Sequence, residues 1–174
     1  DSELETEPFP YLCIDNLLED DFYSKLTEEL NNLNVSKFKV QNFSNGAKYR
    51  NSIRITDKKE TNFKKLSGNV KIFVNMLLDN KKLIYEKLNK KIETNRITES
   101  YSMDIYINQD KKDFFINPHP DVDKTIFTLL YYTPLNNDQK KLGLSLYKKS
   151  ENGKTEGEPC IGGRYDKVKH IDYM

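Results

Sequence analysis

Histidine and cysteine are scarce in this chain, and neither net charge nor hydrophobicity is concentrated anywhere along it. Its two cysteines, Cys13 and Cys160, lie far apart and form no Cys-x-x-Cys pair, which favours a reducing, cytoplasmic location. Acidic and basic residues nearly cancel, leaving a formal net charge of +1, so no basic excess indicates nucleic-acid binding. The hydrophobic runs are too short for a transmembrane helix, so we expect no membrane partner.

The first of only two histidines lies in the run Asn-Pro-His-Pro-Asp at residues 117–121. His119 and Asp121 stand two positions apart, so in an extended chain their side chains project from the same side. An imidazole and a carboxylate placed in this way form most of the two-His, one-carboxylate site that binds non-haem Fe(II). The alternative is a proline-bounded turn in which both side chains bond to backbone, because a bare His-x-Asp motif is short and common.

The pattern of apolar residues predicts helices first and antiparallel strands after them, which is an α+β organisation, and the length predicts one domain. Apolar residues recur every three or four positions in residues 20–33 and 62–78, which predicts two helices packed on a sheet. Gly68 should be tolerated within the second helix at some cost, and the stripe resumes over residues 83–92. Strands are predicted at residues 8–15, 38–43, 49–56, 98–108, 124–133, 143–148 and 168–173.

Five pieces of the chain occur in a familiar order: PFPYLCIDNLL at residues 8–18, PHPD at 118–121, Lys124, FTLLYYTP at 127–134 and LGLSLY at 142–147. Together they resemble the 2-oxoglutarate- and iron(II)-dependent oxygenases, in the prolyl 4-hydroxylase-like branch. The resemblance implies a double-stranded β-helix, or jelly roll, with N-terminal helices buttressing the larger sheet. It also implies that His119 and Asp121 are two Fe(II) ligands, and that 2-oxoglutarate is the cosubstrate in the hydroxylation of an unactivated C–H bond.

The resemblance also indicates residues for the cosubstrate pocket. Tyr106 is the first candidate, because the family often has a tyrosine on the corresponding strand that hydrogen-bonds the distal carboxylate of 2-oxoglutarate. A tyrosine at the rim with a hydrated hydroxyl is the alternative. Thr128 is the second candidate, although its hydroxyl could instead satisfy sheet backbone or face solvent. Arg54 could reach a substrate anion, and a solvated arginine on a strand is the plainer interpretation.

The third metal ligand is where the chain departs from the family pattern. The family requires a distal histidine on a later strand, followed by an Arg or Lys that pairs with 2-oxoglutarate. His170 is the only histidine left, but four residues follow it, and residues 165–174 resemble the strand before that hairpin. We therefore expect a single domain over residues 1–174 that is C-terminally incomplete, with the distal histidine beyond Met174 and little activity in this form.

These expectations describe a dioxygenase that hydroxylates a peptidyl side chain or a small molecule, or a truncated inactive form of one. A non-catalytic jelly-roll binding module that retains His119 and Asp121 by ancestry is the alternative. Specificity in such folds lies in variable loops, so the sequence does not define the substrate. A jelly roll without its last strands would expose Leu129 and Tyr131 and could pair its open sheet edge with a second copy.

Overall fold

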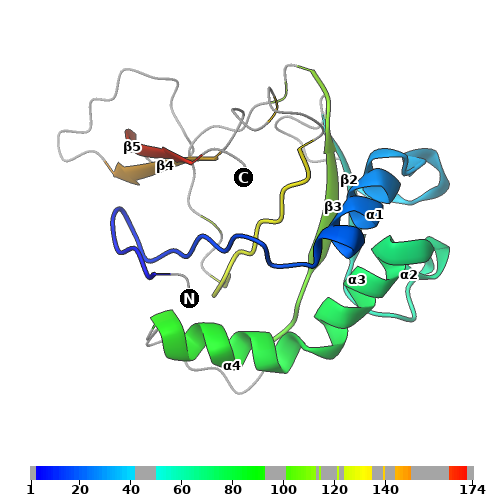
Figure 1. The fold of residues 1–174 in the computed structure, drawn as a ribbon, viewed down its shortest axis with the longest axis horizontal. Helices are drawn as coiled ribbons and strands as arrows, with labels where there is room; N and C mark the ends of the chain where they lie inside the picture. Colours follow the sequence, from blue (N-terminus) through cyan, green and yellow to red (C-terminus); the bar gives the residue numbers. More distant parts are fainter. Residues whose placement is uncertain are drawn as a thin grey trace. The chain divides into compact units, whose positions relative to one another are not determined.

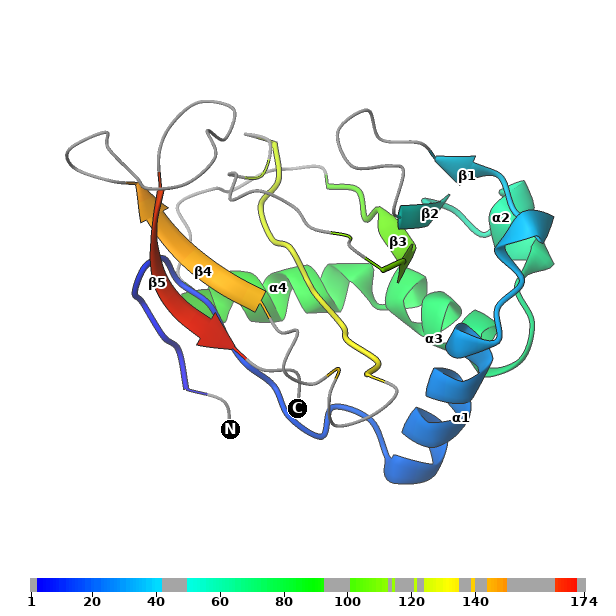
Figure 2. The same cartoon turned by 90° about the horizontal axis from the view of Figure 1, so that it is seen from above.

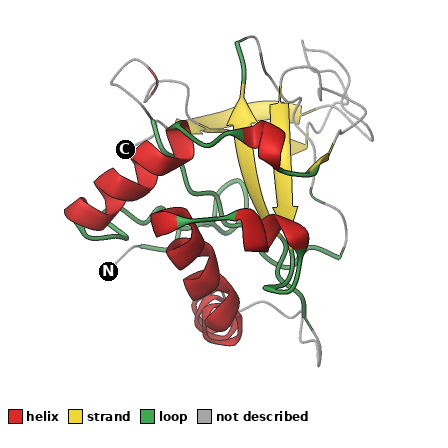
Figure 3. Cartoon of the chain, turned by 90° about the vertical axis from the view of Figure 1, so that its right-hand side faces the viewer, coloured by secondary structure: helices red, strands yellow, loops and turns green. Residues whose placement is uncertain are grey.

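The computed structural model describes residues 3–41, 50–92, 101–112, 114, 121, 124–134, 139, 144–149 and 165–171. Helices and antiparallel strands make up the regular structure of these ranges, so the predicted mixture of the two is confirmed (Figure 3). The chain divides into two compact units, which we call the helical unit (Asn16–Phe115) and the hairpin unit (Asp1–Asp15 with Ile116–Met174). Each unit is described by itself.

The helical unit contains a three-stranded antiparallel sheet in the order β1 (Val40–Gln41), β2 (Arg50–Ile55), β3 (Ile105–Asp110). β2 pairs with β3 over its whole length, from Arg50 opposite Asp110 to Ile55 opposite Ile105. The strand predicted at residues 98–108 therefore begins late, at Ile105. Residues 101–104 have no ladder partner, because the chain after Ile55 turns away. Residues 98–100 lie outside the described ranges. Of the strand predicted at residues 38–43, only the two residues of β1 form a strand within the described ranges. The strand predicted at residues 49–56 is confirmed as β2.

Three helices lie beside this sheet: α1 (Asp20–Asn31), α2 (Thr61–Lys65) and α3 (Gly68–Asp79) (Figures 1 and 2). α1 packs on α3, and α2 packs on β2, as the amphipathic patterns predict. The helix predicted over residues 20–33 is confirmed within two residues of its end. The apolar core of the helical unit consists of Leu26, Phe38, Ile53, Ile55, Phe63, Leu66, Val70, Phe73, Val74 and Leu78, each less than a tenth exposed.

The helix predicted over residues 62–78 is broken into α2 and α3 at Gly68, so the prediction that this glycine continues a helix was wrong. Gly68 has a φ of +56°, in the left-handed region that favours glycine. A Cβ on Gly68 would lie 2.6 Å from Cδ of Glu29 on α1. That carboxylate accepts hydrogen bonds from Asn69 Nδ2 (2.6 Å) and from the backbone N–H of Val70 (3.1 Å). Glu29 thus caps the start of α3 from another helix, where a negative charge is favourable.

Asn62 joins α2 to the sheet through its side-chain amide. Its Oδ1 accepts from the backbone N–H of Lys39 (2.9 Å), and its Nδ2 donates to the carbonyls of Lys39 and Arg54 (3.0 Å each). Asn62 is 8% exposed, so these bonds satisfy polar groups that have little access to water. One side chain therefore fixes β2, the segment before β1 and α2 relative to one another.

The stripe of residues 83–92 forms a helix as predicted, α4 (Lys81–Ile92), and its apolar residues Ile84, Leu88 and Ile92 are half-buried. None of its residues is buried, and Leu83 is 50% exposed. α3 buries four residues of its own stripe in comparison. The ring of Tyr85 on α4 stacks on that of Tyr101, with centroids 4.5 Å apart. The helices that the structure describes include none long and apolar enough to cross a bilayer.

The hairpin unit contains a two-stranded antiparallel sheet of β4 (Leu144–Lys149) and β5 (Tyr165–Ile171). The strand predicted at residues 143–148 is confirmed as β4. The one predicted at 168–173 is confirmed in part as β5, which begins earlier because it pairs with the whole of β4. A register shift between Leu146 and Tyr147 marks a bulge, and Leu146 is 5% exposed.

Two strands predicted for the hairpin unit are not formed in the described ranges. Residues 8–15 make only an isolated bridge between Glu5 and Tyr11, since Pro8 and Pro10 have no N–H to donate to a ladder. Residues 124–134 carry no strand assignment, although they are rich in β-branched and aromatic residues. Such residues fit a sheet but do not make one without a partner strand. Leu129 is 55% exposed, and Tyr131 is partly buried.

Candidate metal site

Asp121 and Thr128 are brought together in the hairpin unit. The Thr128 hydroxyl donates a hydrogen bond to Asp121 Oδ2, across seven positions of sequence. Both residues are exposed, so the carboxylate stands at the surface of the described chain with one oxygen held by a side chain. The sequence named both residues, but it assigned Thr128 to the cosubstrate and gave no sign of this contact.

The donor chemistry at Asp121 fits Fe(II). A carboxylate is one of the three ligands of the facial type, and within the described residues Oδ1 of Asp121 accepts no hydrogen bond. His119 lies outside the described residues, and His170 is placed only by its backbone, on β5 opposite Ser145. Within the described ranges no three His, Cys, Asp or Glu side chains cluster to hold a metal, so one predicted ligand, Asp121, is seen there.

Tyr106 lies on β3 in the helical unit, and its side chain is 41% exposed. Exposure alternates along residues 101–110, with Asp104 and Tyr106 on the more open face, as the period-two pattern predicted. In the ladder Tyr106 stands opposite Arg54. Its role at the cosubstrate stays a prediction, because it belongs to a different unit from Asp121.

Arg54 is engaged within the sheet. Its Nε and Nη2 both donate to Asp104 Oδ2, at 3.2 and 2.8 Å. These hydrogen bonds, and then the negative charge of Asp104, raise the pKa of the Arg54 guanidinium above its usual value. A substrate anion would have to compete with Asp104 for this arginine. The structure therefore favours a paired strand arginine over both interpretations drawn from the sequence.

Two further polar pairs on the same face of β2 and β3 were not predicted. Arg50 donates to Asp110, with Nη2 to Oδ2 at 2.8 Å, and the guanidinium lies 3.9 Å from the ring centroid of Phe114. Ser52 is fully buried and donates to Asn108 at 2.7 Å. The available signal was the alternation of polar residues at 50, 52 and 54 against those at 104–110. These pairs fix the register of β2 on β3.

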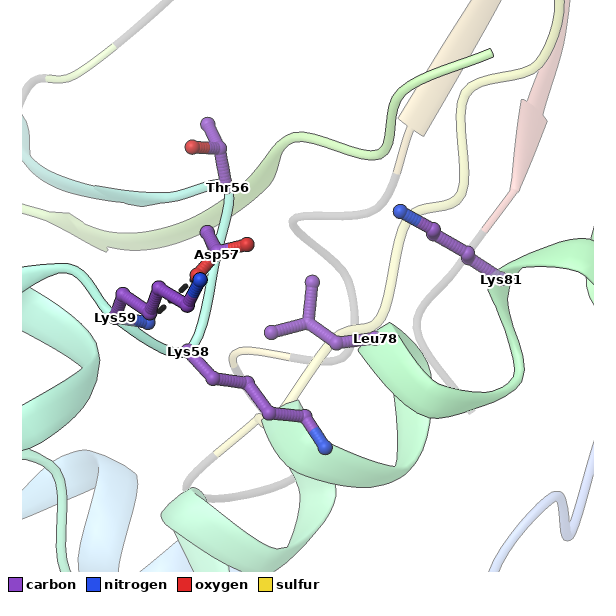
Figure 4. A pocket seen from close by; sticks show the side chains of 6 residues that line it. All are labelled: Thr56, Asp57, Lys58, Lys59, Leu78 and Lys81. Carbon is purple, nitrogen blue, oxygen red and sulfur yellow. Dashed lines mark hydrogen bonds between the residues drawn. The ribbon is translucent and has the colours of Figure 1, made fainter. Parts of the chain in front are cut away.

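A pocket of about 240 Å³ opens in the helical unit where the turn after β2 meets the end of α3 and the start of α4 (Figure 4). Its lining residues are Thr56, Asp57, Lys58, Lys59, Leu78 and Lys81. Lys58 forms an ion pair with Asp79, and Asp57 accepts from the backbone N–H of Lys59 at 2.7 Å. None of the predicted site residues lines this pocket.

Comparisons of the chain with protein-family models, with curated proteins and with solved structures gave no match. The family resemblance therefore depends on the residues themselves. What the structure adds is the pairing of Asp121 with Thr128 and the placement of Tyr106 on an open strand face.

Proposed function

We propose that the protein is an Fe(II)- and 2-oxoglutarate-dependent dioxygenase with a jelly-roll fold, in which His119 and Asp121 bind the metal. The observation that supports this best is the exposure and hydrogen bonding of the Asp121 carboxylate. Its exposed carboxylate accepts a hydrogen bond from the Thr128 hydroxyl, and a second group of this kind is what holds a metal ligand in its orientation. An exposed carboxylate can offer its oxygen to a metal ion.

The jelly-roll part of the proposal is supported by the antiparallel pairing of every strand ladder in the described ranges. Helices α1 to α3 beside the β1–β2–β3 sheet are also what the family's buttressed larger sheet would require. The β4–β5 hairpin would supply strands from the part of the chain that carries Asp121.

In this proposal bound Fe(II) would activate dioxygen, which is the oxidant, and decarboxylation of 2-oxoglutarate to succinate and CO2 would supply two of its four electrons. The C–H bond that is hydroxylated would supply the other two, and the protein would position the reactants and exclude water. Asp121 and the neutral imidazole of His119 would hold the metal. Tyr106 would donate its phenolic proton to the distal carboxylate of the cosubstrate. The substrate would be a peptidyl side chain or a small molecule.

The test is consumption of 2-oxoglutarate by the full-length protein with and without Fe(II), followed as succinate formed. We expect Fe(II)-dependent turnover, and we expect His119→Ala and Asp121→Ala each to abolish it, because each removes a ligand. Asp15→Ala is the matched control, since Asp15 is also an exposed aspartate of the hairpin unit.

Full-length protein that binds neither Fe(II) nor 2-oxoglutarate would contradict the proposal and favour the binding-module alternative.

A further inference from the structure

We infer that Thr128 is a positioning residue for the metal ligand Asp121, which fixes the carboxylate so that Oδ1 alone faces the metal. This inference rests on the proposed function and changes the role of Thr128 from cosubstrate contact to outer support of a ligand. It depends on one observed contact, the hydrogen bond from the Thr128 hydroxyl to Asp121 Oδ2.

The first step of the argument is that Asp121 has little else to hold it. It is exposed, and Thr128 is its hydrogen-bond donor within the described part of the chain. An exposed aspartate that lacks such a donor rotates among several side-chain conformations, and binding a metal then requires that freedom to be lost. A hydroxyl that is already bonded to one oxygen reduces that loss before the metal arrives.

The second step concerns which oxygen is left. An ionised carboxylate offers about four acceptor positions on two oxygens, and a donor on Oδ2 makes that oxygen the poorer metal ligand. Oδ1 carries no such bond in the described structure. Asp121 is therefore set up to bind through a single oxygen, which keeps a position on the metal open.

The third step excludes the earlier role for Thr128. A threonine hydroxyl has one proton to donate. Since that proton is used on Asp121, it cannot also be donated to a carboxylate of 2-oxoglutarate. The two roles consequently make different predictions. A positioning residue affects metal affinity when no cosubstrate is present, whereas a cosubstrate contact affects the KM for 2-oxoglutarate and leaves metal affinity unchanged.

The experiment measures the Kd of Co(II), a redox-stable stand-in for Fe(II), for the full-length protein without 2-oxoglutarate. Thr128→Val removes the hydroxyl at nearly constant volume, and Thr128→Ser keeps it. Loss of a hydrogen-bond partner of a metal ligand typically weakens metal binding about 10–100-fold, so we expect that loss for Thr128→Val and near-normal affinity for Thr128→Ser. Thr133→Val is the matched control, the same replacement in the same extended stretch.

The outcomes separate the inference from the proposed function. If the unmodified protein binds Co(II) and Thr128→Val binds it equally well, the positioning role is wrong and the metal site stands. If the unmodified protein binds no Co(II), the proposed function fails and the inference fails with it. Thermal unfolding of each variant is measured in parallel, and Thr128→Ala replaces Thr128→Val if the latter does not fold. Equal weakening in Thr133→Val would also overturn the inference, since it would show a general effect of the stretch.

Discussion

The helical unit and the hairpin unit differ in how their described residues are held. In the helical unit ten apolar side chains are buried, and the face of the sheet that carries Arg50, Ser52 and Arg54 has a partner for each of these residues. In the described part of the hairpin unit the buried apolar core is Leu146 alone, and Leu129 and Leu130 are each 55% exposed. The difference shows that the buried core and the exposed Asp121 lie in different units, so that losses of packing and losses at Asp121 can be measured separately.

The difference in packing between the two units is tested most directly by truncating one leucine in each unit. Leu26 is fully buried, so Leu26→Ala should lower the free energy of unfolding by about 2–5 kcal/mol, through lost burial and the cavity left behind. Leu129→Ala should change it by no more than about 0.5 kcal/mol. Urea denaturation followed by circular dichroism measures both, and equal losses would show that the two units are equally well packed.

Asn62 should be the most sensitive polar residue of the helical unit. Asn62→Ala leaves backbone groups of Lys39 and Arg54 without their partner and should cost about 2–3 kcal/mol of unfolding free energy. Asn75→Ala is the matched control, because its amide bonds only to exposed Asp79 on the same helix, and it should cost less than about 0.5 kcal/mol. Similar losses from the two variants would contradict the bridging role of Asn62.

Gly68 and Glu29 should act as one unit at the start of α3. Gly68→Ala should cost about 1–2 kcal/mol, because alanine is strained at a φ of +56° and its Cβ meets the capping carboxylate. Glu29→Ala should cost about 1 kcal/mol through loss of the cap. In a double-mutant cycle the two losses should be less than additive, since removing Glu29 gives the new Cβ room. Strict additivity would show that the two residues do not interact.

The pair of Arg54 and Asp104 should have the smallest effect. Both side chains are more than a third exposed. Such ion pairs contribute up to about 1 kcal/mol to the free energy of unfolding, and less in high salt. The pKa of Arg54 is raised in the folded state, so its contribution is fully present below the usual arginine pKa and is lost only as pH rises above it. The destabilisation by Asp104→Asn, measured by urea denaturation, should therefore be constant from pH 7 to 10. A steady decline over that range would contradict this assignment.

The sequence predicted most of the elements whose form depends on local periodicity. α1 and β4 were placed within two residues, and the alternation along β3 was correct, because burial on one face imposes that pattern. The break at Gly68 was missed, since it depends on a carboxylate from another helix. The strand expected at residues 124–133 failed for a related reason, because a strand also requires a partner that local propensity does not supply.

The sequence singled out Asp121 and Thr128, but it did not predict the contact between them. Asp121 was named as a ligand from the His-x-Asp spacing, and Thr128 was named from the stretch that follows. Their hydrogen bond spans seven positions of sequence, and no repeat of two or 3.6 residues specifies such a separation. The pairing of Arg54 with Asp104 was hidden for the same reason, because it depends on the register of β2 on β3.

The central claim, that Asp121 together with His119 binds a divalent iron, is tested most directly by anaerobic calorimetric titration of the full-length protein with Fe(II). We predict one equivalent bound by the unmodified protein, binding abolished by His119→Ala and by Asp121→Ala, and binding unchanged by Asp15→Ala. Undiminished Fe(II) binding by Asp121→Ala, or no binding by the unmodified protein, would contradict the claim.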